Sequence, residues 1–238
     1  MKNISKVIKE NLFINSYLIL DDFITKKSNN IKDVNLILIS KYINNLNISK
    51  VKKFYKKYID TGLIYSLPEF FASDLVTIPK GISDVREYRF FSSFGMILYN
   101  ALGVFFAEMC NDMIKSLNLK KRGIYSYTPT NYTKDSKWKI NNKWQGEYKK
   151  YEKILNEKTF KSDVVLSIDI SHFFNSIDHK KLVKTINSFI NSQNREKYLF
   201  DENSEDILNY YFLSMMGEAK GLPQGKKILL RIIWLICI

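Results

Sequence analysis

Sixteen residues, VVLSIDISHFFNSIDH at positions 164–179, constrain the fold of this chain more than any other stretch. They begin with an apolar run that has the length and β-branched content of a buried strand. Asp169 stands at the end of that run, where a carboxylate can face solvent or a metal ion. Two adjacent phenylalanines follow, and then Asn175 and Ser176 as candidate helix caps. Apolar residues at helical spacing come next, so the pattern predicts a strand, an aspartate, an aromatic turn and an amphipathic helix; these residues are Leu182, Val183, Ile186, Phe189 and Ile190.

An isolated aspartate at a strand end is more often a turn or capping residue than a metal ligand. Here a second stretch accompanies it, GLPQG at positions 221–225. The pattern D-I-x-x-F-F-x-S-I-x-H from Asp169 to His179 resembles the first catalytic motif of reverse transcriptases. Residues 221–225 are similar to the G-x-P-Q-G motif that follows it in the same family. The resemblance is to the group II intron, retron and abortive-infection (phage-defence) branches in particular.

The resemblance implies an α+β fold. Residues 75–238 would form the fingers and a partial palm of a right-hand polymerase, with a Tyr- and Lys-rich insertion at 118–160, after an N-terminal helical region at 1–74. The implied function is RNA-directed DNA synthesis, in which a dNTP is joined to the 3′ hydroxyl of a primer on an RNA or DNA template. The long insertion and the helical N-terminus favour the phage-defence branch over a mobile intron.

The family's reaction uses two Mg²⁺ ions, which stabilise charge during an in-line displacement at phosphorus. By resemblance, Asp169 is the catalytic carboxylate that bridges the metals, and the carbonyl of Ile170 is a further ligand. Phe174 aligns with the aromatic residue that excludes a ribose 2′ hydroxyl, although core packing is the alternative for either of the adjacent phenylalanines. Gln224 and Gly225 align with the turn that contacts the template and the nascent base pair.

A β-hairpin is predicted earlier in the chain. Residues 75–81, LVTIPKG, favour a short strand ended by Pro and Gly, and the return strand is expected at 89–92 after a polar turn. By resemblance to the fingers of reverse transcriptases, Lys80 and Arg89 neutralise the triphosphate of the incoming nucleotide, with Arg86 as a competitor for the second role. The alternative is a pair of exposed hairpin charges.

The family's third motif, an aromatic residue, any residue and two aspartates, is expected after Gly225, but no Asp or Glu occurs there. One aspartate cannot hold two Mg²⁺ ions, so we expect a catalytically incomplete fragment, truncated by a frameshift or an early stop soon after Lys227. The competing class is a non-catalytic module that binds nucleic acid or a partner protein, and a more remote alternative is a helical basic domain whose two motifs arose by chance. Four acidic residues before the turn predict a helix start and its solvated loop: Asp201, Glu202, Glu205 and Asp206.

The formal charge of +13 favours a polyanionic partner, because Lys and Arg that neutralise phosphates release counterions; a solvated basic surface is the alternative. Cys110 and Cys237 are too few for a disulfide framework and indicate a reducing cytoplasm. The apolar run at 228–238 is too short to span a bilayer, so no membrane partner is expected.

Helices are predicted within residues 34–48, 51–59 and 96–114 from their apolar spacing. The aromatics and lysines of the insertion suit either local packing or contact with single-stranded nucleic acid. His172 and His179 are not spaced with Asp169 for a metal site, and we expect them at the surface or at a helix start.

Overall fold

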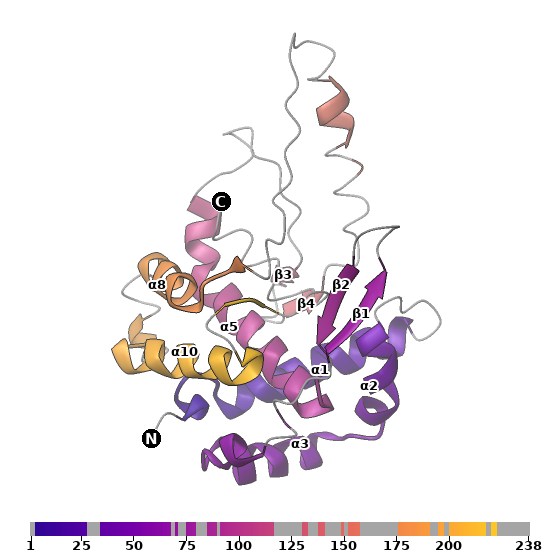
Figure 1. Ribbon diagram of the computed structural model, residues 1–238, viewed down its shortest axis with the longest axis vertical. Helices are drawn as coiled ribbons and strands as arrows, with labels where there is room; N and C mark the ends of the chain where they lie inside the picture. Colours follow the sequence, from indigo (N-terminus) through magenta and orange to yellow (C-terminus); the bar gives the residue numbers. More distant parts are fainter. Residues whose placement is uncertain are drawn as a thin grey trace.

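The computed structural model describes residues 3–27, 34–67, 70, 75–79, 85–89, 91–116, 130–132, 138–140, 149, 152–157, 176–190, 195–197, 200–217 and 220–222. This part of the chain is mainly helical (Figure 1). The helices are η1 (Ile4–Lys6), α1 (Glu10–Lys27), α2 (Val34–Asn44), α3 (Ile48–Phe54), the π-helical turn η2 (Tyr55–Ile59), η3 (Leu63–Ser66), α5 (Ser93–Ser116), α8 (His179–Phe189) and α10 (Glu202–Met216).

The described strands form two separate antiparallel ribbons. Strand β1 (Leu75–Pro79) pairs with β2 (Val85–Arg89), and β3 (Thr130–Tyr132) pairs with β4 (Trp138–Ile140). Each ribbon has only its two hairpin strands. The first confirms the predicted hairpin, although its return strand occupies 85–89 instead of beginning at 89.

The predicted α+β fold, with the fingers and partial palm of a right-hand polymerase, is wrong. The described residues build a helical assembly, and the two short ribbons do not make a palm sheet. The physical reason lies in the core. Apolar side chains are buried where helices meet helices, so these residues reach a packed state without a central sheet to cover.

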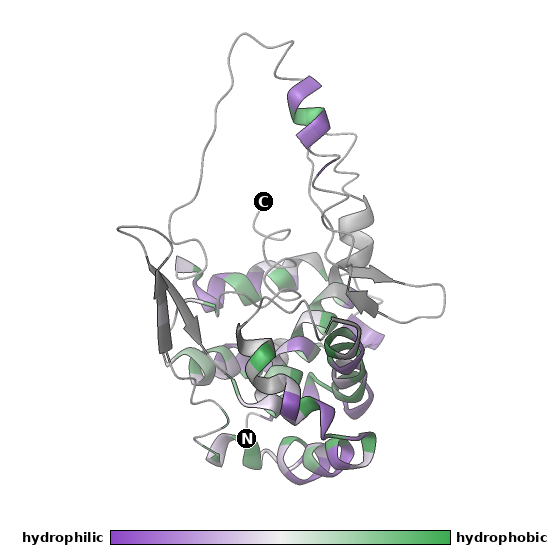
Figure 2. Ribbon diagram, turned by 90° about the vertical axis from the view of Figure 1, so that its right-hand side faces the viewer, coloured by the Kyte–Doolittle hydropathy of each residue, from purple (hydrophilic) through white to green (hydrophobic). Residues whose placement is uncertain are grey.

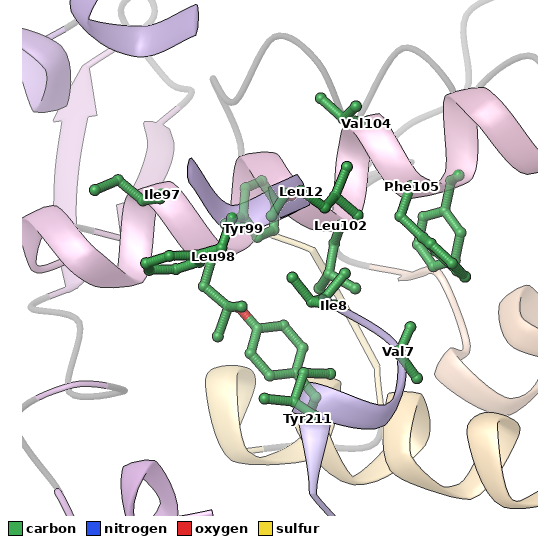
Figure 3. Packing of buried hydrophobic residues seen from close by; sticks show 14 of the residues in the cluster. Val7, Ile8, Leu12, Ile97, Leu98, Tyr99, Leu102, Val104, Phe105 and Tyr211 are labelled. Carbon is green, nitrogen blue, oxygen red and sulfur yellow. The ribbon is translucent and has the colours of Figure 1, made fainter. Parts of the chain in front are cut away.

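Helix α5 occupies the centre of this core. Its apolar residues are buried around most of the helix, as expected of a helix that neighbours cover on several sides. Helix α1 packs along it, and α8 also contacts it. Figure 3 shows side chains of the N-terminal segment and of α10 converging on α5: Val7, Ile8, Leu12 and Tyr211 lie around Leu98, Tyr99 and Leu102. Each fully buried apolar side chain contributes about 2 kcal/mol to this packing.

An aromatic group fixes α3 and η2 to the rest of the core. The ring of Phe54 stacks on that of Phe94 at the start of α5, with 3.7 Å between centroids and 3° between planes. Phe54 also lies against Phe13 of α1 and Phe70. These contacts connect four parts of the chain that are distant in sequence.

The predicted helices are confirmed in place. Helix α5 contains the expected 96–114 segment, α2 lies within 34–48, and α3 with η2 covers 51–59. Figure 2 shows hydrophobic and hydrophilic residues interspersed along the outer helices, which is typical of helices that bury one side. The predicted domain boundary at 74/75 directly precedes Leu75, the first residue of β1, and the core contains residues from both sides of it.

Two capped helices complete the fold. Asp178 caps α8, where Asn175 and Ser176 were expected to do so, and its carboxylate accepts a hydrogen bond from the Lys181 amide at 2.8 Å. Asp201 caps α10 in a reciprocal capping box with Ser204, so the expected helix start at 201–206 is confirmed. Helix α10 ends at Gly217, whose φ of 71° suits the left-handed conformation of a helix terminus.

Two buried tyrosines differ in a way that stability measurements can detect. The Tyr55 hydroxyl donates to the Ile8 carbonyl at 2.8 Å, whereas the Tyr99 hydroxyl has no hydrogen-bond partner among the described residues. Tyr55→Phe should therefore lower the free energy of unfolding by about 1 kcal/mol. Tyr99→Phe should leave it unchanged or raise it, because a desolvated hydroxyl is removed. Urea unfolding followed by circular dichroism measures both, and an equal loss in the two variants would contradict this difference.

Candidate functional site

Most of the residues assigned to the site by sequence lie outside the described residues. Arg89 is the exception in its backbone, as the last residue of β2. The roles given to the others stay predictions: Asp169, Ile170, Phe174, Lys80, Gln224 and Gly225.

The register of the β1–β2 hairpin bears on the choice between two arginines. Arg89 pairs with Leu75, at the end of the ladder away from the turn. Arg86 pairs with Ile78, next to the Pro79–Val85 pair with which the ladder ends. The backbone of Arg86 therefore lies nearer the turn of the hairpin than that of Arg89. Lys80 lies outside the described residues, and its pairing with either arginine stays a prediction.

The structure brings together the end of the first motif and the start of the second. Residues Ile177–His179 lie beside residues Lys220–Leu222, and we call this contact the motif clasp. The Gly221 amide donates to the Ile177 carbonyl at 2.8 Å, and Asp178 and Lys220 form an isolated antiparallel bridge. The His179 side chain adds a third connection through Nε2, which lies 2.6 Å from the Gly221 carbonyl oxygen.

Local sequence chemistry makes the clasp possible. Gly221 has a φ of 91°, a conformation that residues with a Cβ adopt at a cost, so a glycine is suited to this position. Leu222 is buried beside it, with 1% of its surface exposed. Asp178 has an extended backbone and is the N-cap of α8, and its hydrogen bond from the Lys181 amide is the main cause that lowers the pKa of its carboxyl.

His179 is buried in the clasp, with 2% of its surface exposed, and its ring lies 5.4 Å from that of Phe212 in α10. A carbonyl oxygen can only accept, so Nε2 carries the proton that it donates to Gly221. Nδ1 is buried without a hydrogen-bond partner in the described part of the chain. Burial lowers the pKa of His179 and outweighs the Gly221 carbonyl and the Asp178 carboxylate, which both raise it. The neutral imidazole with its proton on Nε2 is the form that this geometry accommodates.

Of the two positions expected for His179, the surface or a helix start, the helix start is confirmed. It is the first residue of α8, as a helix-start histidine would be, but it is buried and not at the surface. The sequence held a signal for burial, because His179 precedes Leu182, Val183 and Ile186 at the spacing of one helix face.

The described residues contain no group of three or more His, Cys, Asp or Glu side chains that could hold a metal ion. Asp169 and Ile170 lie outside that search. Within the described ranges, no helix is long and apolar enough to cross a membrane.

Comparison of the sequence with protein-family models and with curated proteins gives no significant match.

Acidification should destabilise the protein through His179. Because its folded-state pKa lies below the ordinary value of 6.5, the unfolded chain takes up a proton first as the pH falls. The stabilisation is complete above about pH 6.5 and is lost as the pH falls through the folded-state pKa. His179→Gln keeps a donor but does not titrate. Urea denaturation measures the free energy of unfolding of the wild type and of the variant at each pH. The wild-type value minus the variant value should decrease as the pH falls from about 7.5 to about 5. A difference that stays constant across this range would contradict the assignment.

Proposed function

We propose that this chain is a cytoplasmic nucleic-acid-binding protein of the reverse transcriptase type, which binds an RNA or DNA template–primer and a dNTP with Mg²⁺. The motif clasp is the observation that supports the proposal most. It joins His179 and Gly221, which are 42 residues apart. His179 is the last residue of the first motif and Gly221 is the first residue of the second, and the resemblance assigns both motifs to one active site. Two motifs that form one site must lie next to each other, and the described ends of these two motifs do so.

The proposed chemistry assigns separate tasks to the two segments. Asp169 and the Ile170 carbonyl supply hard oxygen ligands, which Mg²⁺ prefers. Phe174 selects deoxynucleotides by occupying the space of a 2′ hydroxyl. Gln224 and Gly225 contact the template and the nascent base pair.

Lys80 and one arginine of the β1–β2 hairpin neutralise the triphosphate on this proposal. A guanidinium can hold phosphate oxygens through two parallel hydrogen bonds, and an ammonium acts as a point charge. The resemblance assigns this role to Arg89, with Arg86 as the competitor.

Binding and catalysis are separate parts of the proposal. Nucleotidyl transfer by two metal ions needs more than one carboxylate, and the sequence after Gly225 contains no Asp or Glu. We therefore expect these 238 residues to bind template–primer and nucleotide without extending the primer.

A non-catalytic module that binds nucleic acid is the second candidate. The formal charge of +13 favours it independently of the motifs, since counterion release supplies affinity for any polyanion. The two candidates differ in whether a nucleotide and Mg²⁺ affect binding.

Fluorescence anisotropy with a labelled RNA–DNA primer–template tests the proposed function. A dNTP complementary to the template should tighten binding in Mg²⁺ by about tenfold, equivalent to about 1.4 kcal/mol. Asp169→Asn should abolish this tightening, because it removes the metal carboxylate, while binding without nucleotide remains. The matched control is Asp206→Asn, which removes the same charge at an exposed position of α10.

Each outcome of this experiment separates the candidates. Binding that no nucleotide tightens supports the non-catalytic module and contradicts the reverse-transcriptase-type site. Equal behaviour of the two Asn variants rejects Asp169 as the metal ligand. Primer extension that Asp169→Asn abolishes would show that the 238 residues are catalytically complete, contrary to the expectation above.

A further inference from the structure

The outer side of α3 and η2 carries a concentrated positive charge. Residues 48–59, ISKVKKFYKKYI, place Val51, Tyr55 and Ile59 in the core. The exposed side of the same segment, which begins with Ile48 and Ser49, carries five lysines that we call the lysine face: Lys50, Lys52, Lys53, Lys56 and Lys57.

The lysine face lacks compensating negative charge within its own segment. No Asp or Glu occurs from residue 48 to 59, and the first to follow is Asp60. Among the described residues no ion pair joins these lysines to a carboxylate; the Lys50 ammonium donates to the Asn45 carbonyl at 3.1 Å, and that of Lys57 lies 4.9 Å from the centre of the Tyr58 ring. Glu10 of α1 and Asp60 both lie close enough to affect the buried Tyr55 hydroxyl.

The spacing of the lysines is unfavourable for the helix alone. Lys52 and Lys56, and likewise Lys53 and Lys57, stand four residues apart, where like charges on a helix repel one another. Lysines near a helix C-terminus interact well with the helix dipole, and because η2 continues α3 directly, this accounts for Lys56 and Lys57 in the last turn. The dipole accounts less well for the lysines nearer the start of α3, so a partner that neutralises several cations at once would relieve this repulsion.

The chemistry of the face selects the partner. Its cations are all lysines, which act as point charges toward phosphates and do not provide the fork that reads a guanine edge. No aromatic side chain of the segment is fully exposed as a stacking platform for bases: Tyr55 is buried, Phe54 stacks on Phe94, and Tyr58 is half-buried against Phe54. Nor does it present a wide apolar stripe of the kind that enters a lipid surface. Two lysines that are four residues apart on a helix are separated by about 6 Å along its axis. This separation is close to the distance along a duplex that two phosphate steps of one strand cover, roughly 7 Å.

We propose that the lysine face binds the phosphate backbone of a nucleic-acid duplex without regard to its sequence. The inference rests on the proposed function for its kind of partner, and it adds a contact outside the two motifs. In Figure 1, α3 lies at the end of the molecule away from α8, where the motif clasp begins, so the lysine face is a second contact and not part of the clasp.

The test is the salt dependence of duplex binding by the full chain, measured by anisotropy with a labelled RNA–DNA duplex. The lysine-face variant is Lys52→Gln, Lys53→Gln and Lys56→Gln. Its slope of log affinity against log salt should be smaller than that of the wild type by about 2 to 3, with affinity at low salt reduced at least about tenfold. A matched variant, Lys180→Gln, Lys181→Gln and Lys184→Gln, removes the same charge from exposed positions of α8 and should change the slope by less than about 1.

Two further measurements keep the result interpretable. Substituting Lys52, Lys53 and Lys56 by Arg preserves the charge and should preserve the slope of log affinity against log salt. The Gln variant should unfold at the same or a higher temperature than the wild type, because repulsion between the lysines is removed. Equal effects of the α3 and α8 variants would reduce the effect to net charge and overturn the proposal. The proposal would also be overturned if the lysine-face variant bound the duplex as the wild type does, or if it lost binding only to vesicles of anionic lipid.

The lysine face and the motif site fail in different ways. A smaller salt slope in the lysine-face variant, together with wild-type binding that no dNTP tightens, would support the lysine face and contradict the reverse-transcriptase-type site. Wild-type binding that dNTP and Mg²⁺ tighten, together with a lysine-face variant that behaves as the wild type, would support the reverse-transcriptase-type site and contradict the lysine face.

Discussion

The need to cover α5 governs the rest of the described structure. A 24-residue helix that is apolar on most sides is not stable when exposed to water. Helix α1 therefore packs along α5, and α8 packs against it as well. Helix α10 in turn packs on α8 and on the N-terminal turn η1, and Tyr211 reaches the same core. Because the flanking helices gain most of their stability from this contact, their caps and ends acquire defined positions only when α5 is covered.

The motif clasp is one consequence of that packing. It lies between the start of α8 and the chain that follows α10, and both helices contribute to its burial through His179 and Phe212. Inside such a site a hydrogen bond is not exchanged with water, so the Nε2–H of His179 holds the Gly221 carbonyl more firmly than an exposed donor would. The same burial makes a charged imidazole costly. Burial therefore favours the neutral form of His179 in the clasp, although a charged imidazole would keep the same Nε2–H donor.

Local patterns predicted the helices well because each pattern is satisfied within its own segment. The spacing of apolar residues placed α5, α2 and the segment of α3 and η2, and the acidic cluster at 201–206 placed the start of α10. Helix α1 was expected only as part of a helical region over 1–74. The cap of α8 was missed for a non-local reason. Asn175, Ser176 and Asp178 are all residue types that cap helices well. The residue that caps α8 is Asp178, and it also forms the bridge with Lys220, which is distant in sequence.

The fold class was missed for a different reason. The α+β expectation came from the resemblance of two short motifs, whereas the described residues, with their helical periodicity, pack as helices and form only two-stranded ribbons. The spacing of His179 with Leu182, Val183 and Ile186 indicated a position on the buried face of α8. The partner of its side chain was not predictable, because the spacing within one helix carries no information about a backbone carbonyl 42 residues later.

The central claim is that the neutral His179 joins the two motif segments, and the ¹⁵N NMR signals of its imidazole test this directly. The chain has two histidines, so the spectrum of His179→Gln assigns the signals. We expect the Nε2–H tautomer at neutral pH, with a ring proton that exchanges slowly with water. A ring that carries its proton on Nδ1, or that averages between tautomers as an exposed imidazole does, would contradict the account.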